Sequence, residues 1–598
     1  MKLPVITSLI HYSKVFYGYA GKKLFVLVSV ISLSSIFDGL GISILIPIFD
    51  IANQESSQNV FTQNVYMFLE LIGLEVSIPS LLLLLVAIFS LKGFFLFSQD
   101  FITALITTNL NKSLRIEFCK KYADLNYEFF TNTNVGYLNN IITTEINRAI
   151  QALRNYIHIV ILIAFIMVFV GASLIINWKI TLLTVAISSI IFLMLRSLSR
   201  KSNRLSILES KTNAQIQSLL LQCLYNFKYL KATDRFNSLF RPLFRIIDKN
   251  RYCTFKRFVY LAVPNAIREP LAAYLLSGLI LYYVFFMGKV MGEVFVVLIF
   301  FYRTFTNIMK FPSIWQKFNG SVGGINVVKE ASENIHNNME HLGSIKIKSF
   351  RKNIEFKNVA FAYNNKQVLS NINIVIPKNK AIGIVGESGA GKTTIFDLIT
   401  GLLKANEGDI FIDSINYKEL DISSLRTLVG YVTQEPVMFN DTIGNNISFW
   451  DSNDQNETGK DKIKTAAEYA NCDSFVADME ECYETIMGDQ GVRSSGGQRQ
   501  RIAIAREIYK EPEILIFDEA TSSLDSESEI KIQESILKMI GKRTLLIISH
   551  RLSTVKNCDY IYVLKNGEIA EEGTFGDLYN GETLFNEMCR AQKLSNYI

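Results

Sequence analysis

The stretch Ala381-Ile-Gly-Ile-Val-Gly-Glu-Ser-Gly-Ala-Gly-Lys-Thr393 decides the fold of the second half of the chain. Its first five residues predict a buried strand, and the apolar run from Thr394 to Leu403 predicts a helix. Between them stands the pattern G-x-x-x-x-G-K-[ST], whose backbone N–H groups surround phosphate oxygens beside the positive end of a helix. In this pattern Lys392 reaches the β- and γ-phosphates, and Thr393 ligates Mg²⁺. The stretch therefore predicts a nucleotide-binding α/β domain, with contacts from Gly386, Glu387, Ser388, Gly389, Ala390, Gly391, Lys392, Thr393 and Thr394.

Two later strands also end in polar side chains, at the edge where parallel α/β sheets bind ligands. Asp518 and Glu519 follow the apolar run 514–517, and His550 follows the run 544–548 closely. Asp518 can hold the metal through water, and Glu519 can polarise an attacking water. A lone histidine after a strand is usually structural, but His550 follows a strand of the same predicted sheet. This position favours a contact with the γ-phosphate.

The first part of the chain has a different composition. Residues 1–340 hold 32 Lys+Arg against 18 Asp+Glu, and the remainder holds 29 against 37. Over the whole chain 49% of residues are hydrophobic and 19% are charged, whereas globular proteins average about 25% charged. A disordered, collagen-like or coiled-coil chain is thereby excluded. The basic residues lie between apolar runs, which indicates a membrane region and not a nucleic-acid surface.

Six apolar runs approach the length of ~20 residues that a helical span needs. They are residues 24–47, 80–107, 155–176, 180–197, 259–286 and 291–311. The segment 48–79 contains no Lys or Arg, whereas the second-to-third and fourth-to-fifth connections are rich in both. Because positive residues stay on the cytoplasmic side, we expect both termini in the cytoplasm. Residues 59–73 then lie outside, as a short amphipathic helix or a packed loop.

The ends of the chain and its thiols fit the same topology. We expect no cleavable signal peptide, because the apolar run that follows residues 1–23 is too long for one. None of the seven cysteines stands at metal-site spacing, and all fall on the predicted cytoplasmic side, so we expect free thiols.

A few ionisable residues interrupt the predicted spans, where charge is costly and usually faces a cavity or a partner. They are Asp38 in the first span, Arg268 and Glu269 in the fifth, and Arg303 and Lys310 in the sixth. Two interpretations stand open. Arg268, Arg303, Lys310 and Asp38 could belong to a site for an anionic head group. Alternatively, Arg268 could pair with Glu269, or Arg303 with Asp38, as internal salt bridges.

A further motif, Ser495-Gly-Gly-Gln498, precedes a predicted helix between the phosphate-binding loop and the strand 514–517. Alone it is a weak signal. In this order and beside the other motifs, it makes the chain resemble the ATP-binding cassette (ABC) transporters, specifically exporters with six spans fused to one cassette. The resemblance covers nearly the whole chain. It implies an α-helical six-span transmembrane domain (1–340), a linker (341–350) and an α/β P-loop ATP-binding cassette domain (351–598).

The resemblance also implies roles for particular residues. Tyr363 is similar to the aromatic residue that stacks on adenine, and Gln434 to the glutamine that touches Mg²⁺ and the attacking water. The segments similar to those that couple the two domains or contact the partner cassette are 128–136, 225–231, 488–491 and 523–525. In this family Ser495, Gly496, Gly497 and Gln498 of one chain complete the phosphate site of another. Ser494 departs from the family pattern, which usually has Leu there, and this departure bears on the tuning of nucleotide affinity.

These expectations define a function. The resemblance implies that the chain acts as a homodimer in the bacterial cytoplasmic membrane and uses ATP and Mg²⁺ to drive export, with catalysis by Lys392, Gln434, Glu519 and His550. Short stretches such as Phe37–Phe49 and Tyr302-Arg303 resemble flippases for polyprenyl-pyrophosphate-linked oligosaccharides. The alternative is a multidrug or lipid A-type lipid exporter.

Other classes of function are disfavoured. No Cys/His pair precedes the first span, so we expect no leader-cleaving peptidase. The six spans exclude an ABC ATPase that works on nucleic acid, and the intact Glu519 and Lys392 exclude a silent cassette.

Overall fold

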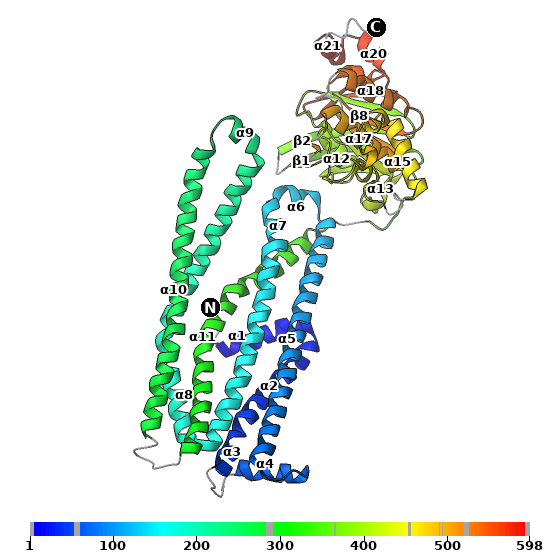
Figure 1. The fold of residues 1–598 in the computed structure, drawn as a ribbon. Helices are drawn as coiled ribbons and strands as arrows, with labels where there is room; N and C mark the ends of the chain where they lie inside the picture. Colours follow the sequence, from blue (N-terminus) through cyan, green and yellow to red (C-terminus); the bar gives the residue numbers. More distant parts are fainter. Residues whose placement is uncertain are drawn as a thin grey trace. The chain divides into compact units, whose positions relative to one another are not determined.

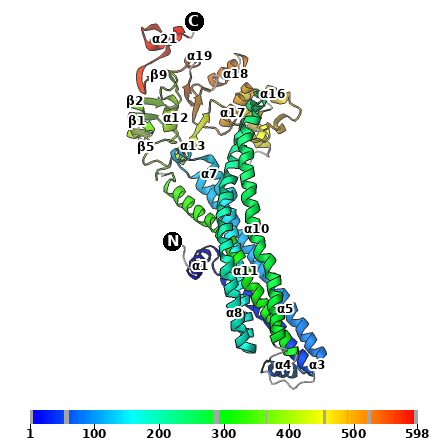
Figure 2. The same cartoon turned by 90° about the vertical axis from the view of Figure 1, so that its left-hand side faces the viewer.

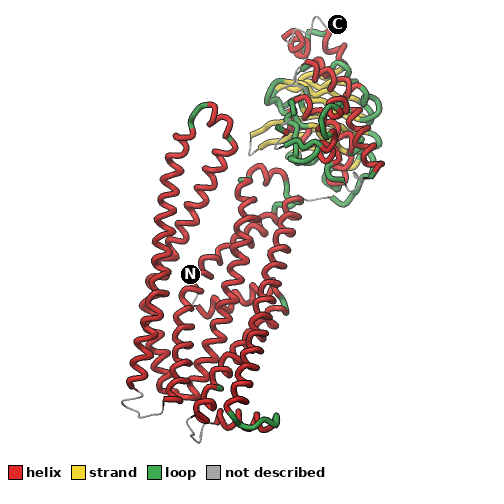
Figure 3. Tube along the Cα trace, viewed as in Figure 1, coloured by secondary structure: helices red, strands yellow, loops and turns green. Residues whose placement is uncertain are grey.

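The chain divides into two compact units in the computed structural model. The structure describes residues 5–52, 60–282, 291–340, 343–363, 366–451, 456–488, 491–492, 494–519, 526–549 and 551–591. One unit is Met1–Asp124 with Thr133–Asn338, and the other is Leu125–Asn132 with Met339–Ile598. The first is helical, and all the named strands lie in the second (Figure 3).

Long helices build the first unit, which Figures 1 and 2 show from two sides. Its elements are α1 (Val5–Ala20), α2 (Lys23–Ser43), α3 (Leu45–Ala52), α4 (Val60–Leu71), α5 (Ile78–Ala123), α7 (Val135–Asn140), the π-helical turn η1 (Ile141–Glu145), α8 (Ile146–Tyr225), α9 (Phe227–Ala232), α10 (Phe236–Tyr282) and α11 (Met291–Asn337). Helix α8 packs against α2, α5, α10 and α11. The start of α5 is encoded locally, because Ser77 and Ser80 form a reciprocal capping box there.

Three helical segments of the described residues have the length and apolar composition of a membrane span. They are Lys23–Ala52, Ile78–Ala123 and Val135–Ile175. The first two contain the predicted spans 24–47 and 80–107, and the third covers the predicted span 155–176 up to Ile175. The other three predicted spans lie on α8, α10 and α11, and residues 283–290 of this region lie outside the described residues.

The third and fourth predicted spans both lie on α8. Helical residues extend from Ile146 to Tyr225 and contain the predicted spans 155–176 and 180–197. The neighbouring helices α7 and α9 lie at the same end of the unit (Figure 1), so the chain reverses direction within this stretch. The stretch α8 therefore holds two helical arms that run in opposite directions, as two successive spans do.

Three short helices lie between the long helices, in segments that the sequence analysis had set apart from the spans. Helix α4 forms within the predicted segment 59–73, with Val65 and Leu69 packed in one cluster with Leu81. Helix α6 (Tyr127–Asn132) and helix α9 (Phe227–Ala232) overlap the two segments, 128–136 and 225–231, that resemble coupling regions. Helix α6 belongs to the second unit and α9 to the first.

The second unit contains two sheets. The four-stranded sheet has the order β2-β1-β4-β5, and the six-stranded sheet has the order β10-β9-β3-β8-β7-β6. The strands are β1 (Asn353–Tyr363), β2 (Lys366–Pro377), β3 (Ala381–Gly386), β4 (Glu407–Ile412), β5 (Ile415–Asn416), β6 (Val429–Val432), β7 (Ile514–Asp518), β8 (Thr544–Ile548), β9 (Tyr560–Lys565) and β10 (Glu568–Gly573). All pairs of the larger sheet are parallel except β9 with β10.

Helices of the second unit connect and cover these strands. They are α12 (Lys392–Ile399), α13 (Ile422–Leu428), α14 (Ile443–Ser448), α15 (Glu457–Tyr469), α16 (Asp473–Ala477), the 3₁₀ turn η3 (Cys482–Glu484), α17 (Gly496–Tyr509), α18 (Ser526–Leu537), α19 (Leu552–Val555), α20 (Phe575–Asn580) and α21 (Leu584–Ala591).

The six-stranded sheet is buried on both faces. Along β7, Leu515 and Phe517 belong to one apolar core, and Ile514 and Ile516 belong to the other. Successive residues of a strand point to opposite faces, so a continuous apolar run is what a doubly covered parallel strand requires. The cores hold the sheet rigid, and its polar strand ends are positioned accordingly.

Candidate nucleotide site

The loop after β3 has a backbone that only glycine fits well. Gly389 and Gly391 have φ angles of +82° and +101°, in the left-handed region where glycine carries no steric cost. A Cβ on Gly391 would lie 2.5 Å from Leu369 Cδ2, whereas a Cβ on Gly389 would meet nothing within 4 Å. The loop is therefore packed firmly against β2 on one side and leaves open space on the other, as a phosphate cradle needs.

Lys392 begins α12 and turns its ammonium into this loop. The side chain is buried, and Nζ donates to the carbonyl oxygens of Gly386 at 3.0 Å and Glu387 at 2.9 Å. Burial lowers the pKa of Lys392, and the negative charges of Glu519 and Asp518 oppose that shift. Next to it, Thr393 is exposed, so its hydroxyl is accessible to a ligand.

The end of β7 brings two carboxylates to the same edge. Asp518 is buried, and its Oδ2 accepts a hydrogen bond from the Tyr431 hydroxyl at 3.1 Å. Glu519 has a φ of +46°, and its Oε2 accepts from Gln434 Nε2 at 2.9 Å. A left-handed backbone at a non-glycine residue costs about 1–2 kcal/mol. Such strain is often found at functional sites.

Two neighbours of Asp518 were not singled out as site residues from the sequence. Burial, then the charge of Asp518, raises the pKa of Asp397 to about 6. Burial and the same charge also raise the pKa of the Tyr431 phenol. The available signals were small: Asp397 interrupts an apolar helix, and Tyr431 stands three residues before Gln434.

Tyr363 ends β1 close to the start of α12. Its ring is 41% exposed and meets Phe361 edge to face, with 4.8 Å between ring centroids. Its hydroxyl shares a hydrogen bond with Thr394, and its pKa is raised by burial and then by nearby Asp397. The negative charge of Glu128 on α6 also raises the pKa of Tyr363. An exposed ring beside the phosphate loop suits a nucleobase.

The segment Ser495–Gln498 starts α17. Ser495 Oγ accepts from the Gln498 backbone N–H at 3.2 Å, and Gln498 Oε1 accepts from the Ser495 N–H at 2.9 Å. Ser494, which stands where the family has Leu, donates to the Gly491 carbonyl at 2.9 Å. Within the described part of this chain, no hydrogen bond joins Ser495 or Gln498 to loop residues 386–391.

His550, the segment 523–525, Asp489 and Gln490 lie outside the described residues. Among the described residues there is also no group of three or more His, Cys, Asp or Glu side chains that could hold a metal ion by itself. That arrangement fits Mg²⁺ bound with a nucleotide, because Mg²⁺ typically uses one or two carboxylates together with substrate phosphates.

The charged residues of the predicted spans have the following partners. Asp38 pairs with Lys92, with Nζ 2.5 Å from Oδ1, and not with Arg303, the partner that the sequence suggested. Arg268 lies 3.7 Å from Glu269, the other suggested pair. Lys310 lies within electrostatic range of both Arg268 and Arg303. Lys92 went unnoticed because one lysine in the apolar second span resembles any isolated charge.

Comparison with known proteins agrees with this geometry. Residues 369–522 match the ABC transporter family model, and residues 24–313 match the ABC transporter transmembrane region. The heterocyst differentiation ATP-binding protein HepA of Nostoc sp. is 33% identical over 480 residues, which cover 79% of this chain and 77% of HepA. An ATP-dependent lipid A-core flippase of Desulfotalea psychrophila is 29% identical, over 83% of this chain and 87% of the flippase.

A solved structure extends the match to the fold. The structure of a bacterial Atm1-family ABC exporter with ATP bound superposes with a TM-score of 0.77, covering 96% of this chain and 99% of that one at 22% identity. Its fold, the nucleotide-loop geometry and the two family matches agree. This chain belongs to the ABC transporter family, as a half-transporter that joins a helical transmembrane region to an ATP-hydrolysing cassette.

Proposed function

We propose that this chain is an ATP-driven exporter that moves an amphipathic lipid from the inner to the outer side of a bacterial cytoplasmic membrane. The observation that carries the proposal is the meeting of Lys392, Asp518, Glu519 and Gln434 at one sheet edge, in a chain that also has a membrane region. We assign residues 1–340 to the transmembrane domain, 341–350 to the linker and 351–598 to the cassette. Both termini lie in the cytoplasm.

The site residues divide the work of hydrolysis. Tyr363 packs against adenine, the loop Gly386–Gly391 surrounds the phosphates, and Lys392 neutralises their charge. Thr393, Gln434 and Asp518 would hold Mg²⁺, which would supply charge stabilisation when bound with ATP. Glu519, oriented by Gln434, polarises the attacking water, and His550 contacts the γ-phosphate.

The absence of a hydrogen bond between the Ser495–Gln498 segment and the phosphate loop, within the described residues, supports a dimer. One chain carries one loop and one Ser495–Gln498 segment, and no hydrogen bond joins the two within the described residues. The first N–H groups of an α-helix have no partner within the helix, and they and the positive dipole end of α17 attract phosphate oxygens. A second copy of this chain would bring that helix end to the ATP held by the first. This chain carries both an intact phosphate loop and an intact Ser495–Gln498 segment, which favours a homodimer.

The substrate is best matched by a polyprenyl-pyrophosphate-linked oligosaccharide. Arg268, Arg303 and Lys310 bring three positive charges to one region, and Glu269 is the carboxylate paired with Arg268. Guanidinium groups bind pyrophosphate oxygens through two parallel hydrogen bonds. Because Lys92 neutralises Asp38, Asp38 would orient the helices and not touch the head group. The name of the Desulfotalea relative supports a lipid substrate and keeps a lipid A-type or multidrug exporter as the alternative.

Reconstituted flipping tests the head-group role. In proteoliposomes, Arg268→Ala with Arg303→Ala should keep basal ATPase activity while the translocation of a pyrophosphate-linked lipid falls about tenfold or more, since each charged hydrogen bond contributes ~1.5–3 kcal/mol. Arg251→Ala is the matched control, because Arg251 lies on the same helix α10 and is exposed. It should flip lipid like the unaltered chain.

Two other outcomes would contradict the proposal. Normal flipping by the double variant would discard the head-group role and favour the drug or neutral-lipid alternative. A lower melting temperature that neutralising Glu269 restores would make Arg268 part of a structural ion pair.

A further inference from the structure

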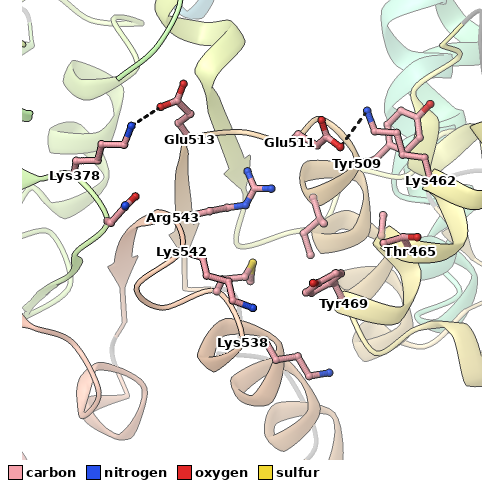
Figure 4. A pocket seen from close by; sticks show the side chains of 14 residues that line it. Lys378, Lys462, Thr465, Tyr469, Tyr509, Glu511, Glu513, Lys538, Lys542 and Arg543 are labelled. Atoms are coloured by element: carbon pink, nitrogen blue, oxygen red, sulfur yellow. Dashed lines mark hydrogen bonds and ion pairs between the residues drawn. The ribbon is translucent and has the colours of Figure 1, made fainter. Parts of the chain in front are cut away.

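A cavity lies in the cassette unit, at the edge of the six-stranded sheet opposite the phosphate loop. It has a volume of about 520 Å³ and is lined by four separate stretches of chain (Figure 4). These are the turn that enters β3, helix α15, the connection from α17 to β7, and the turn from α18 into β8. The amino ends of β3, β7 and β8 therefore meet at this cavity, as their carboxyl ends meet at the nucleotide site.

Positive charge is in excess around this cavity. Five basic side chains line it against two carboxylates: Lys378, Lys462, Lys538, Lys542 and Arg543, with Glu511 and Glu513. Lys378 pairs with Glu513 at 3.2 Å and Lys462 with Glu511 at 3.8 Å, so both carboxylates are already neutralised.

The turn from α18 into β8 carries the remaining charge. Lys538 donates to the amide oxygen of Asn471 at 2.9 Å, and Arg543 donates to the Pro512 carbonyl. Among the described residues, none of Lys538, Lys542 and Arg543 forms an ion pair with a carboxylate. Like charges crowded without counter-charges repel one another, and an anion in the cavity would relieve that repulsion.

The rest of the lining is apolar or aromatic. Ala466, Ile508 and Met539 are buried and form a floor, and the ring of Tyr469 is 41% exposed. Figure 4 shows Tyr469 and Thr465 across the cavity from Lys542 and Arg543. A flat group could pack on the floor beside the Tyr469 ring while an anionic group reaches the basic turn.

We infer that this cavity is a second ligand site, for a small molecule that joins a phosphate group to a flat ring. Its volume lies in the range of about 300–1,000 Å³ that small-molecule sites occupy. A concave site of this size, with one basic wall, suits a small ligand better than a protein surface. Guanidinium and ammonium groups together bind phosphate oxygens strongly.

The site is separate from the nucleotide site. Glu513 lines the cavity just before β7, and Glu519 stands just after it. At ~3.3 Å per residue, the two glutamates lie about 20 Å apart along the strand. A ligand in the cavity therefore cannot touch the phosphate loop, and its binding does not depend on the assigned transport function.

Lysine labelling tests the site in the full-length, detergent-solubilised protein. Pyridoxal 5′-phosphate is the probe, because it carries a phosphate, a flat ring and an aldehyde that condenses with a lysine amine and releases water. Borohydride reduction fixes the product, and peptide mapping measures labelling at Lys538 and Lys542. Lys464 is the reference, since it is exposed on the same helix α15 as Lys462 but does not line the cavity.

The expected result is a ratio. Labelling at Lys538 and Lys542 should exceed that at Lys464 about tenfold with pyridoxal 5′-phosphate, as a charge-assisted hydrogen bond of ~1.5 kcal/mol implies. Pyridoxal, which lacks the phosphate, should give a ratio near one. Arg543→Gln should lower the first ratio several-fold, whereas Arg351→Gln, which removes an exposed arginine outside the cavity, should not.

A second variant and a competition experiment make the test independent of folding and of the nucleotide site. If Arg543→Gln does not fold, Lys542→Gln is the second variant. Lys542 is exposed, so its substitution should not disturb folding. The loss of its positive charge should lower labelling at Lys538. AMP should protect both lysines at lower concentration than inorganic phosphate, also in the Lys392→Ala variant. Equal ratios for the two probes, or no effect of either variant, would overturn the site. Equal protection by AMP and phosphate would overturn the role of the ring.

Discussion

The two edges of the six-stranded sheet in the cassette carry opposite charge. At the carboxyl edge, Lys392 stands among Asp397, Asp518 and Glu519, so acidic groups are in excess. At the amino edge, five basic side chains line a cavity with two carboxylates. An acidic edge can hold a polyphosphate only with the help of Mg²⁺ and backbone N–H groups, whereas a basic edge can hold an anion directly. The two ends of the same strands are therefore suited to bind anions in different ways, one through Mg²⁺ and backbone N–H groups and the other through basic side chains.

The edges also differ in how their residues are distributed along the chain. The residues at the carboxyl edge come from short contiguous motifs, because a tight loop places residues that are neighbours in sequence around one phosphate. The amino edge is assembled from four distant stretches, none of which is unusual alone. Substitutions at the carboxyl edge should therefore change ATP binding or hydrolysis, whereas matched substitutions at the amino edge should not.

The largest expected effect is at Glu519. Glu519→Gln removes the charge that polarises water and keeps the size of the side chain, so ATP should still bind while steady-state hydrolysis falls ~100-fold or more. ATP should then trap a closed cassette dimer, visible as a shift in size or crosslinking. Glu511→Gln, an exposed glutamate at the other end of β7, is the control and should keep full activity. Turnover of Glu519→Gln within a factor of two of the unaltered chain would remove Glu519 from the proposed role.

Lys392 should give the next effect. Lys392→Ala deletes the cation on the β- and γ-phosphates, so ATP affinity should drop about 10- to 100-fold, and turnover should drop with it. Fluorescence titration with a nucleotide analogue measures the affinity. Lys542→Ala removes a cation from the amino edge and should leave the affinity of the phosphate loop for ATP unchanged. Unchanged nucleotide binding by Lys392→Ala would refute the interpretation of the phosphate loop.

The contrast explains what the sequence could predict. The phosphate loop, Asp518 and Glu519 were predicted because each lies in a contiguous motif beside a buried strand, and Gln434 was implied by the family resemblance. The structure brings these residues to one edge. The long helices followed from apolar length alone. The Asp38–Lys92 pair and the basic cavity were missed, because both depend on residues that meet only after packing. The way the chain turns within α8 was not predicted, because hydropathy marks spans and does not report how they are joined.

Tyr431 sharpens the comparison at smaller scale. Tyr431→Phe removes the hydroxyl that donates to Asp518 Oδ2 at 3.1 Å, so the carboxylate should lose orientation and kcat should fall about 3- to 10-fold. ATP affinity should stay within twofold, which distinguishes positioning from binding. Tyr509→Phe is a matched control, because the Tyr509 hydroxyl makes a similar bond to Asp451 at 3.3 Å near the amino edge. If both variants lower kcat equally, the effect is structural and Tyr431 does not act through Asp518.

The smallest expected effect concerns stability at Asp397. Burial and Asp518 raise its pKa to about 6 from an ordinary 3.8, so between these pH values the folded chain holds more protons than the unfolded one. Stability should therefore fall as pH rises from about 4 to 6, and the ionised carboxylate should remain unfavourable above that range. Asp397→Asn removes this cost and should stabilise the nucleotide-free protein at pH 8 by about 1 kcal/mol, discounted for partial solvent screening. The shift in Tm would then be about 2–4 °C, and it should vanish near pH 4.

Asp409→Asn is the control, because hydrogen bonds from Lys418 and Asn416 lower the pKa of Asp409. Loss of the Asp409 carboxylate should therefore not stabilise the protein at pH 8. Thermal melts of the full-length protein measure both variants, and an equal Tm shift for Asp397→Asn at pH 4 and pH 8 would contradict the assigned titration.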